Sequence, residues 1–251
     1  MMSTFGVEII RYKDGKAEHL QDLVIKEEWL DLYVNGELLL QTPLSGGEAE
    51  ELIHGFLFIE GYIGFGERLE IEKEYSSFST EVRGEVKPRT MKELVDCASS
   101  KIEFGDPIEP LVSDRRYSAG NILRLAAEFQ RLPSLYHRTG GVHMAAFARE
   151  EILHSADDIS RRNAVDKVIG KVFLSAPPGG FFAEGLLLSS GRISSDIVVR
   201  MIHAGVPLII SKSAPTDKAV RLADYYGVTL CGFARGARFN VYTHSYRIDF
   251  E

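Results

Sequence analysis

The sequence is poor in cysteine, with Cys97 and Cys231 as the two in 251 residues. Two cysteines exclude a scaffold that several disulfides hold together. The sequence also lacks an apolar run of the roughly 20 residues that a membrane-spanning helix needs. Its first residues lack the apolar segment of a signal peptide. We therefore expect a cytoplasmic protein with reduced thiols and no membrane contact.

A zinc signature is lacking as well. Zinc deaminases pair H-x-E with P-C-x-x-C, whereas Met144 and Ala145 follow His143 here and glycines follow Pro177 and Pro178. We therefore expect no metal site of this kind. For His143 we favour a strand histidine that is hydrogen-bonded in the core, because a metal role would need partners.

An excess of basic charge is also lacking. The chain has 29 Lys and Arg against 36 Asp and Glu, and this net charge of −7 argues against nucleic-acid binding. The charge is unevenly spread, since residues 1–113 have a net charge of −12 and residues 114–251 one of +5. Of the 18 basic residues in the second part, 14 are arginines, which suit bidentate anion binding. The alternative is a salt-bridged interface between an acidic and a basic domain.

The first part of the chain predicts a small domain of strands and one helix. Asn35 and Gly36 between two β-like stretches are a strong signal for a type I′ hairpin. A helical pattern starts at residues 45–48 and runs through Glu60. Its expected buried face is Leu52, Ile53, Phe56, Leu57 and Ile59. The expected strands are residues 7–12, 23–25, 30–34, 37–40, 69–75 and 78–82.

Residues 88–110 predict a connection between two domains, because turn-forming residues are dense there. We expect a short helix at residues 91–96, with Cys97 in the loop that follows it. The first domain is then residues 1–113 and the second residues 114–251.

The second part alternates helices and strands. The expected helices are residues 118–132, 162–174, 194–204 and 216–226. The expected strands are residues 142–148, 152–156, 185–189, 206–211, 229–234 and 239–242. This order predicts a mixed or largely parallel sheet that helices cover. In such sheets ligands bind at the carboxyl ends of the strands.

Glycines and cations gather at the expected junctions of strands and helices. They occur in residues 138–143, 161–167, 189–192, 211–216 and 233–243. Glycine lets a backbone approach phosphate closely, and arginine offers a rigid fork of donors. Together these segments predict a composite site for a large anionic ligand.

Residues 233–238 are the clearest of these segments. Gly236 would let the loop fold tightly while Arg235 and Arg238 point at an anion. The segment is neither a Walker A loop nor G-x-G-x-x-G. A turn with two solvated arginines is the alternative.

Other cations are expected near the same anion. Arg192 and Lys212 follow two of the expected strands. Arg161 follows Ser160, the expected N-cap of a helix, where a cation opposes the helix dipole unless an anion lies there. A plain amphipathic helix is the alternative for that segment.

The two cysteines have different surroundings. Cys231 lies in an apolar strand and is interpreted as a buried small hydrophobic residue. Cys97 has Lys92 and Lys101 nearby in sequence, which lower the pKa of a thiol, whereas Asp96 raises it. Both an inert surface thiol and a reactive one stay open for Cys97.

Five of the segments resemble the FdhD/NarQ family, in the order in which the family has them. They are residues 138–143, 161–170, 190–194, 213–216 and 232–242. The first third of the chain resembles the family mainly in pattern and length. The resemblance implies a cytidine-deaminase-like three-layer α/β/α domain without zinc, preceded by a small α+β domain.

The resemblance also implies a function. Members of this family are accessory sulfurtransferase proteins of formate dehydrogenase. They accept sulfur as a persulfide from a cysteine desulfurase and pass it to the molybdenum cofactor, Mo-bis(molybdopterin guanine dinucleotide), before its insertion. The chain would then be a sulfur carrier, expected as a homodimer, and GDP would mimic part of the cofactor.

Two sets of site residues follow from the resemblance. The cofactor-contacting stretch of the family matches Phe233, Ala234, Arg235, Gly236, Ala237 and Arg238. The persulfide cysteine of the family matches Cys97. Many members have Cys-x-x-Cys, whereas Ser100 stands in the place of the second cysteine here. A mechanism with two thiols is therefore excluded, and a non-catalytic cofactor chaperone is the alternative function.

Overall fold

A six-stranded sheet is the largest element of the computed structural model, which describes residues 3–65, 67, 70–74, 78–83, 110–176 and 181–251. Its strand order is β13-β12-β11-β10-β8-β9. The strands are β8 (His143–Ala148), β9 (Ile152–Asp158), β10 (Leu186–Ser189), β11 (Leu208–Ser211), β12 (Thr229–Arg235) and β13 (Arg238–Thr243). β10, β11 and β12 are parallel, whereas β8, β9 and β13 each run antiparallel to a neighbour. The sheet is therefore mixed, as the alternation of helices and strands predicted.

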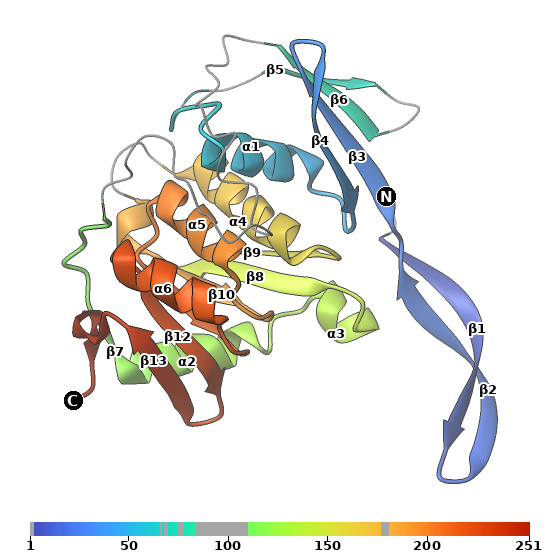
Figure 1. Ribbon diagram of the computed structural model, residues 1–251. Helices are drawn as coiled ribbons and strands as arrows, with labels where there is room; N and C mark the ends of the chain where they lie inside the picture. Colours follow the sequence, from blue (N-terminus) through green and yellow to red (C-terminus); the bar gives the residue numbers. More distant parts are fainter. Residues whose placement is uncertain (1–2, 66, 68–69, 75–77, 84–109, 177–180) are drawn as a thin grey trace.

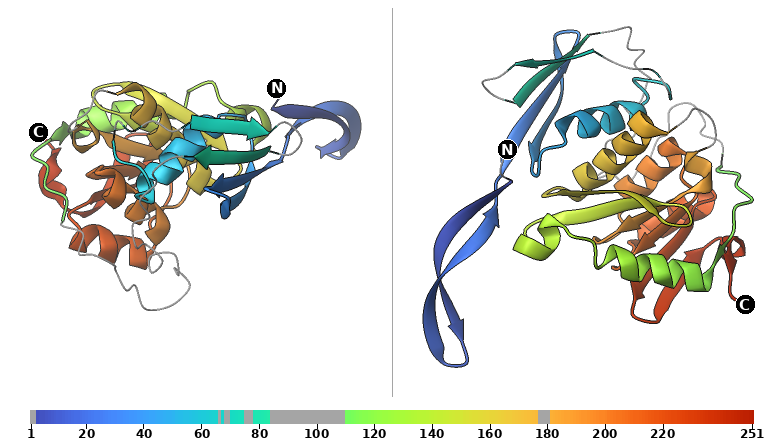
Figure 2. Two further views of the ribbon diagram at one scale, coloured as in Figure 1. Left: turned by 90° about the horizontal axis from the view of Figure 1, so that it is seen from above. Right: turned by 180° about the vertical axis from the view of Figure 1, so that it is seen from behind.

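Helices cover both faces of this sheet (Figure 1). One face carries α4 (Arg161–Ser175), α5 (Ser195–Ala204) and α6 (Asp217–Tyr225), and the other carries α2 (Ala119–Phe129) (Figure 2). Each of these helices lies within three residues of its predicted bounds. A fully buried aliphatic side chain stabilises the fold by ~1.5–3 kcal/mol. One cluster of buried apolar side chains lies between the sheet and α4, α5 and α6, and another lies between the sheet and α2. These two clusters hold the strands in place, and with them the strand ends on which a site can be built.

A smaller sheet lies beside the first, with strand order β4-β3-β6-β5. Its strands are β3 (Glu28–Val34), β4 (Glu37–Leu44), β5 (Glu70–Glu74) and β6 (Phe78–Arg83). Asn35 and Gly36 have φ angles of 50° and 84°. A type I′ turn needs positive φ at both positions, so the predicted hairpin is confirmed.

The helix α1 (Ala49–Ile59) packs this smaller sheet against α4. All five apolar residues expected on its inner face are buried. Gly55 of α1 lies against Gly170 of α4. A Cβ atom at Gly55 would be 1.8 Å from the carbonyl oxygen of Asp166, and one at Gly170 would be 1.8 Å from that of Glu51. The two helix backbones therefore touch where they cross.

A hairpin of β1 (Thr4–Lys13) and β2 (Lys16–Ile25) extends away from the rest of the chain (Figures 1 and 2). Its turn is Asp14 and Gly15, which both have positive φ. The sequence predicted two shorter, separate strands, and their lengths were wrong. Most side chains of both strands are exposed, so burial imposes little alternation that a pattern could reveal.

Several short elements were missed because they are too short for periodicity to show. They are α3 (Leu135–Thr139), β7 (Tyr117–Ser118), β14 (Ile248–Asp249) and the 3-10 turns η1 (Phe182–Glu184) and η2 (Ser245–Arg247). The helix expected at residues 91–96 lies outside the described residues. The α/β class is confirmed, whereas the cytidine-deaminase-like arrangement and the domain boundary at residue 113 stay predictions. Among the described helices, none is long and apolar enough to cross a bilayer.

Candidate functional site

The Gly- and Arg-bearing segments lie at one edge of the six-stranded sheet. β10, β11 and β12 are parallel, so the loops that follow them leave the sheet at the same edge. β8 runs the other way, with Ala145 paired to Ser189, and therefore its beginning lies at that edge too. The topology thus brings together segments that lie up to about 100 residues apart in the chain.

Hydrogen bonds between the loops hold this edge together. Ser190 and Met144 are joined twice, from the Ser190 backbone N–H to the Met144 carbonyl at 3.0 Å and from the Met144 N–H to the Ser190 hydroxyl at 3.0 Å. The Ser213 hydroxyl donates to the carbonyl of Ser190 at 3.2 Å, and the carbonyl of Ser213 accepts from the Phe233 N–H at 3.1 Å. The predicted small donors therefore serve to join neighbouring loops to one another.

The predicted anion loop at residues 233–238 is the tip of the β12–β13 hairpin. Arg235 and Arg238 are register partners, and Gly236 in the turn has a φ angle of 60°. Both arginines are exposed, and neither forms an ion pair with a described carboxylate. Like charges that face each other across a strand pair destabilise it. A bound anion would remove that repulsion.

Phe233 and Gly232 fix the position of this tip. Phe233 has a φ angle of 54°, and its ring lies 5.7 Å from the guanidinium carbon of Arg235. A left-handed backbone is unfavourable for a residue with a side chain, and such strain gathers at functional sites. A Cβ atom at Gly232 would be 3.0 Å from the ring of Pro215, so the strand lies tight against the β11 loop.

Ala234 differs from its neighbours in the matched stretch. Its side chain is 1% exposed, and its carbonyl accepts from the side chain of Gln130 at 3.3 Å. Ala234 therefore anchors the hairpin on α2 and does not present a side chain to a ligand. Gly236 and Ala237 at the tip are exposed.

Arg192 and Lys212 lie in the two neighbouring loops. Arg192 is exposed at the end of β10, and Lys212 is half-buried at the end of β11. The Lys212 backbone N–H donates to the carbonyl of Ser189 at 3.1 Å. Neither side chain pairs with a carboxylate of the described part. Both cations are therefore available to the ligand that the sequence predicts.

The cations at the start of α4 have an acidic partner. Arg161 and Arg162 each lie 3.9 Å from a carboxylate oxygen of Asp196, and Arg161 also donates to the hydroxyl of Ser194 at 2.7 Å. Ser160 caps the helix as predicted, accepting from the Asn163 N–H. Asp196 offsets part of the positive charge, so this segment is a weaker candidate for the predicted anion site than the hairpin tip.

Asp166 and Lys167, the last residues of that motif, do not reach the edge. Lys167 is fully buried and pairs with Asp158 at 2.7 Å, and Asp166 is buried beside Arg200 at 2.9 Å. Burial raises the pKa of Asp166 to about 7 although Arg200 acts in the opposite direction. These residues join α4 to its neighbours in the interior.

His143 is the first residue of β8 and is half-buried. Burial lowers its pKa, and the positive charge of Arg161 lowers it further, while Asp158 raises it. A Cβ atom at Gly191 would be 3.2 Å from its Nδ1 atom. Its ring makes no hydrogen bond to a residue of the described ranges, so the expected core hydrogen bond was wrong.

The structure describes one of the two cysteines. Cys97 lies outside the described residues. Cys231 is fully buried in β12, and burial raises the pKa of its thiol to about 12. Cys231 is therefore inert as a nucleophile, in agreement with the interpretation of its sequence context.

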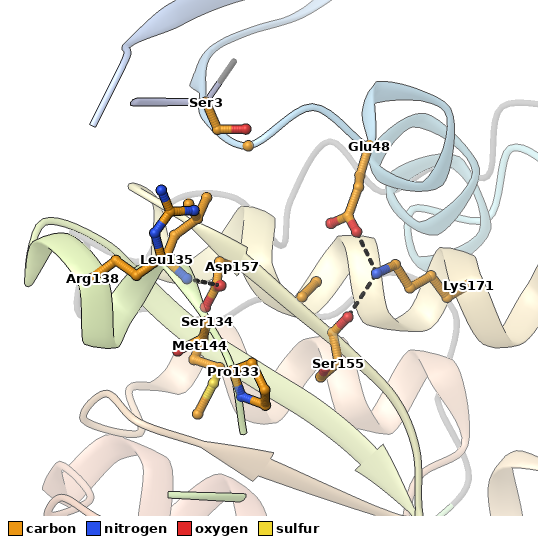
Figure 3. Close-up of a pocket in the computed structure, with 12 residues that line it drawn as sticks. Ser3, Glu48, Pro133, Ser134, Leu135, Arg138, Met144, Ser155, Asp157 and Lys171 are labelled. Atoms are coloured by element: carbon orange, nitrogen blue, oxygen red, sulfur yellow. Dashed lines mark hydrogen bonds and ion pairs between the residues drawn. The ribbon is translucent and has the colours of Figure 1, made fainter. Parts of the chain in front are cut away.

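Arg138 lies in a different place from the other arginines of the motifs. It lines a pocket of about 500 Å³ beside α3 (Figure 3), and α3 lies away from the β12–β13 hairpin (Figure 1). The lining residues are Ser3, Gly46, Glu48, Pro133, Ser134, Leu135, Arg138, Met144, Ser155, Ala156, Asp157 and Lys171. No local sequence pattern indicates this pocket, because its walls come from six separate parts of the chain.

Comparisons with known proteins agree on one family. The FdhD/NarQ family model matches residues 25–249. "Sulfur carrier protein FdhD" of Sulfolobus acidocaldarius is 37% identical over 97% of this chain and 98% of that protein, and its namesake of Bacillus licheniformis is 32% identical over 99% and 98%.

A solved structure, described as a putative formate dehydrogenase accessory protein from Desulfotalea psychrophila, has the same fold. It has a TM-score of 0.79 and 23% identity, and the match covers 98% of this chain and all of that one. With this fold, the full-length relatives and the match of the family model, the chain belongs to the FdhD/NarQ family.

Proposed function

We propose that this protein is a sulfur carrier for a formate dehydrogenase. The observation that carries the proposal is the alignment of relatives named sulfur carrier protein over 97% and 99% of the chain. Shared identity of 37% and 32% over the full length supports a shared function as well as a shared fold. The exposed cations at one edge of the six-stranded sheet support the same function, because they suit an anionic cofactor.

The substrate that we propose for this edge is Mo-bis(molybdopterin guanine dinucleotide). Its pyrophosphates would lie against Phe233–Arg238, with Arg192 and Lys212 in the neighbouring loops. Two facing arginines without carboxylate partners among the described residues are what a pyrophosphate would neutralise. A Cβ atom at Gly236 would have no heavy atom within 4 Å, so the tip is open to a ligand.

Cys97 is the sulfur-carrying residue in this proposal. Its thiolate would attack the outer sulfur of a donor persulfide, the donor S–S bond would break, and the donor cysteine would leave as a thiolate. Cys97 would then hold the sulfur until it passes to the cofactor. Cys231 cannot replace it, because a buried thiol with a pKa of about 12 has almost no thiolate at neutral pH.

The partners that we propose follow the same function. A cysteine desulfurase would be the sulfur donor, a formate dehydrogenase would be the client, and the carrier would act in the cytoplasm as a homodimer. We also propose that the larger domain is a cytidine-deaminase-like fold without zinc, since helices cover both faces of its mixed sheet.

Mass spectrometry of two matched variants tests the carrier. After incubation with a cysteine desulfurase and cysteine, the protein should gain about 32 Da per transferred sulfur atom. Cys97→Ala should lose this gain and should fail to activate formate dehydrogenase, whereas Cys231→Ala should keep it. GDP binding by Cys97→Ala should stay unchanged. Normal activation of the enzyme by Cys97→Ala would exclude the carrier function.

A non-catalytic cofactor chaperone is the second candidate function, and Ser100 in the place of a second cysteine favours it. Such a protein would bind GDP at the same hairpin and gain no mass. The two functions therefore predict different masses for the wild-type protein after incubation with the desulfurase, and they predict the same nucleotide binding.

A further inference from the structure

The pocket beside α3 is a second site. It is separate from the edge of the six-stranded sheet at which Arg192, Lys212 and residues 233–238 lie. The walls of the pocket are the base of the β1–β2 hairpin at Ser3, the loop around Gly46, α3 with the two residues before it, Met144 of β8, β9 and Lys171 of α4 (Figure 3). None of the residues at the tip of the β12–β13 hairpin lines it. A volume of about 500 Å³ lies in the range of small-molecule sites.

Two of the four charged side chains in this pocket satisfy each other. Lys171 pairs with Glu48 and also donates to the carbonyl of Ser155 at 2.6 Å. Figure 3 shows this lysine between its two partners. The pair therefore adds no net charge for a ligand to compensate.

Arg138 and Asp157 are the other two charged groups. Arg138 is exposed and forms no ion pair with a described carboxylate. One oxygen of Asp157 accepts from the Leu135 N–H at 2.7 Å, and the other, Oδ1, has no hydrogen-bond partner in the described part of the chain. The pocket thus offers one guanidinium and one carboxyl group that are not paired with each other.

Asp157 is partly buried, and its surroundings act on its pKa in both directions. Burial raises its pKa, the Leu135 N–H lowers it, and the charges of Glu48 and of Lys167 act in opposite directions. A buried carboxyl oxygen without a partner is costly, and a ligand N–H would remove that cost.

The wall that holds these groups is fixed before any ligand binds. Gly46 has a φ angle of 77°, and a Cβ atom there would be 3.0 Å from a methyl carbon of Leu135. Ser134 caps α3 by accepting from the His137 N–H. α3 is therefore seated against β9 and the loop before α1.

Three other kinds of occupant fit less well. An inorganic anion could pair with Arg138 but would leave Asp157 without a donor, and an apolar ligand would leave both groups unpaired. A peptide strand that pairs with the outer edge of β9 is disfavoured, because the carbonyls of Ser155 and Asp157 are already taken by Lys171 and Lys167.

We propose that this pocket binds a small zwitterion, either a free α-amino acid or the end of a short peptide. The ligand carboxylate would pair with Arg138, and its ammonium or amide N–H would donate to Asp157. Ser134 and Ser155 lie in the lining beside them. The site would act independently of the sulfur that the protein carries.

Calorimetry with blocked and free peptides tests the proposal. The probes are alanine, trialanine, N-acetyl-trialanine and trialanine amide. The wild-type protein should bind trialanine or alanine saturably, and each blocked peptide at least tenfold more weakly. Alanine and trialanine distinguish a free amino acid from a peptide end.

Two variants assign the ends of the ligand. Arg138→Gln should bind trialanine no better than the amide, and Asp157→Asn should lose the preference over the acetylated peptide. Arg131→Gln, an exposed arginine outside the lining, is the matched control and should behave as wild type. GDP binding and persulfide formation should be unchanged in all three.

Either of two results would overturn the proposal. One is the lack of saturable binding of alanine and trialanine to the wild-type protein. The other is equal binding of the free, acetylated and amidated peptides, because the two charged ends would then play no part.

Discussion

Arg235 and Arg238 face each other across the last pair of the β12–β13 hairpin, with the two exposed residues Gly236 and Ala237 between them. No described carboxylate pairs with either arginine. The two cations repel each other, and an anion bound by both guanidinium groups would remove that repulsion. The ligand proposed for this tip would therefore stabilise the hairpin locally.

The first prediction concerns Arg238→Ala. It should weaken GDP binding by a factor of about 10 to 150, since a charge-assisted hydrogen bond to a phosphate is worth about 1.5–3 kcal/mol. The free energy of unfolding without ligand should stay within about 0.5 kcal/mol of wild type, because a repulsion is removed. Calorimetry and urea unfolding measure the two effects.

The control for Arg238→Ala is Arg221→Ala, on the exposed face of α6. It should leave the affinity for GDP unchanged. If Arg238→Ala also binds GDP with wild-type affinity, the hairpin tip is not a nucleotide site.

The second prediction concerns the crossing of α1 and α4. Gly170→Ala should destabilise the protein by more than about 3 kcal/mol, because its Cβ atom would lie 1.8 Å from the Glu51 carbonyl oxygen and the helices must separate. Gly120→Ala in α2 meets only the Ser118 hydroxyl, at 4.0 Å, and should be neutral or stabilising by up to about 1 kcal/mol. Equal midpoints of urea unfolding for the two variants would contradict the close packing.

Asp166 is the subject of the third prediction. Its pKa is raised from 3.8 to about 7 in the folded state, so the folded protein binds a proton that the unfolded chain releases. The stability that Asp166 contributes therefore falls as the pH rises from about 4 to about 7 and levels off above that range. Arg200, Arg162, Glu60 and Asp196 are the charges that face it.

Asp166→Asn isolates this effect, because the amide resembles the protonated acid. The free energy of unfolding of wild type minus that of the variant should decrease between pH 4 and pH 7. Urea titrations at pH 4, 5, 6, 7 and 8 measure it. A difference that increases with pH would mean that the buried carboxylate is ionised beside Arg200.

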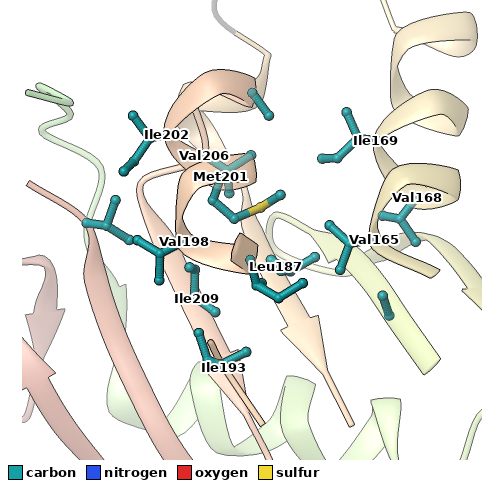
Figure 4. Packing of buried hydrophobic residues seen from close by; sticks show 14 of the residues in the cluster. Val165, Val168, Ile169, Leu187, Ile193, Val198, Met201, Ile202, Val206 and Ile209 are labelled. Carbon is teal, nitrogen blue, oxygen red and sulfur yellow. The ribbon is translucent and has the colours of Figure 1, made fainter. Parts of the chain in front are cut away.

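The sequence predicted the central sheet and its helices well, because burial there leaves a clear pattern. Val165, Val168 and Ile169 of α4 recur at helical spacing and pack toward the same cluster as Val198 and Met201 of α5 (Figure 4). Asn35 and Gly36 likewise predicted the type I′ turn between β3 and β4 correctly, because both positions need a positive φ angle. By contrast, the β1–β2 hairpin has two exposed faces, so its strands left no alternation to detect.

The site could be predicted in part. Strand order places the loops after β10, β11 and β12 at one edge, so grouping Arg192 and Lys212 with residues 233–238 followed from topology. The direction of a side chain did not follow, as the buried Ala234 shows. Arg138 faces a pocket whose walls come from distant segments, and no local pattern encodes such a pocket.

The fourth prediction separates strain from binding at Phe233. Its φ angle of 54° costs about 1 kcal/mol or more for a residue with a Cβ atom, and glycine adopts this conformation freely. Phe233→Gly and Phe233→Ala both remove the ring beside Arg235, but the strain is removed in the glycine variant alone. The glycine variant should therefore be more stable than the alanine variant in urea, by the strain energy less the ~0.4–1 kcal/mol that the greater unfolded-state entropy of glycine costs.

Both variants should bind GDP more weakly than wild type, and to the same extent, if the ring positions the guanidinium of Arg235. Calorimetry on the two proteins compares them directly. Wild-type affinity in both would show that the ring has no part in the site. A glycine variant less stable than the alanine variant by about 0.4–1 kcal/mol would show that the left-handed backbone at Phe233 carries no strain.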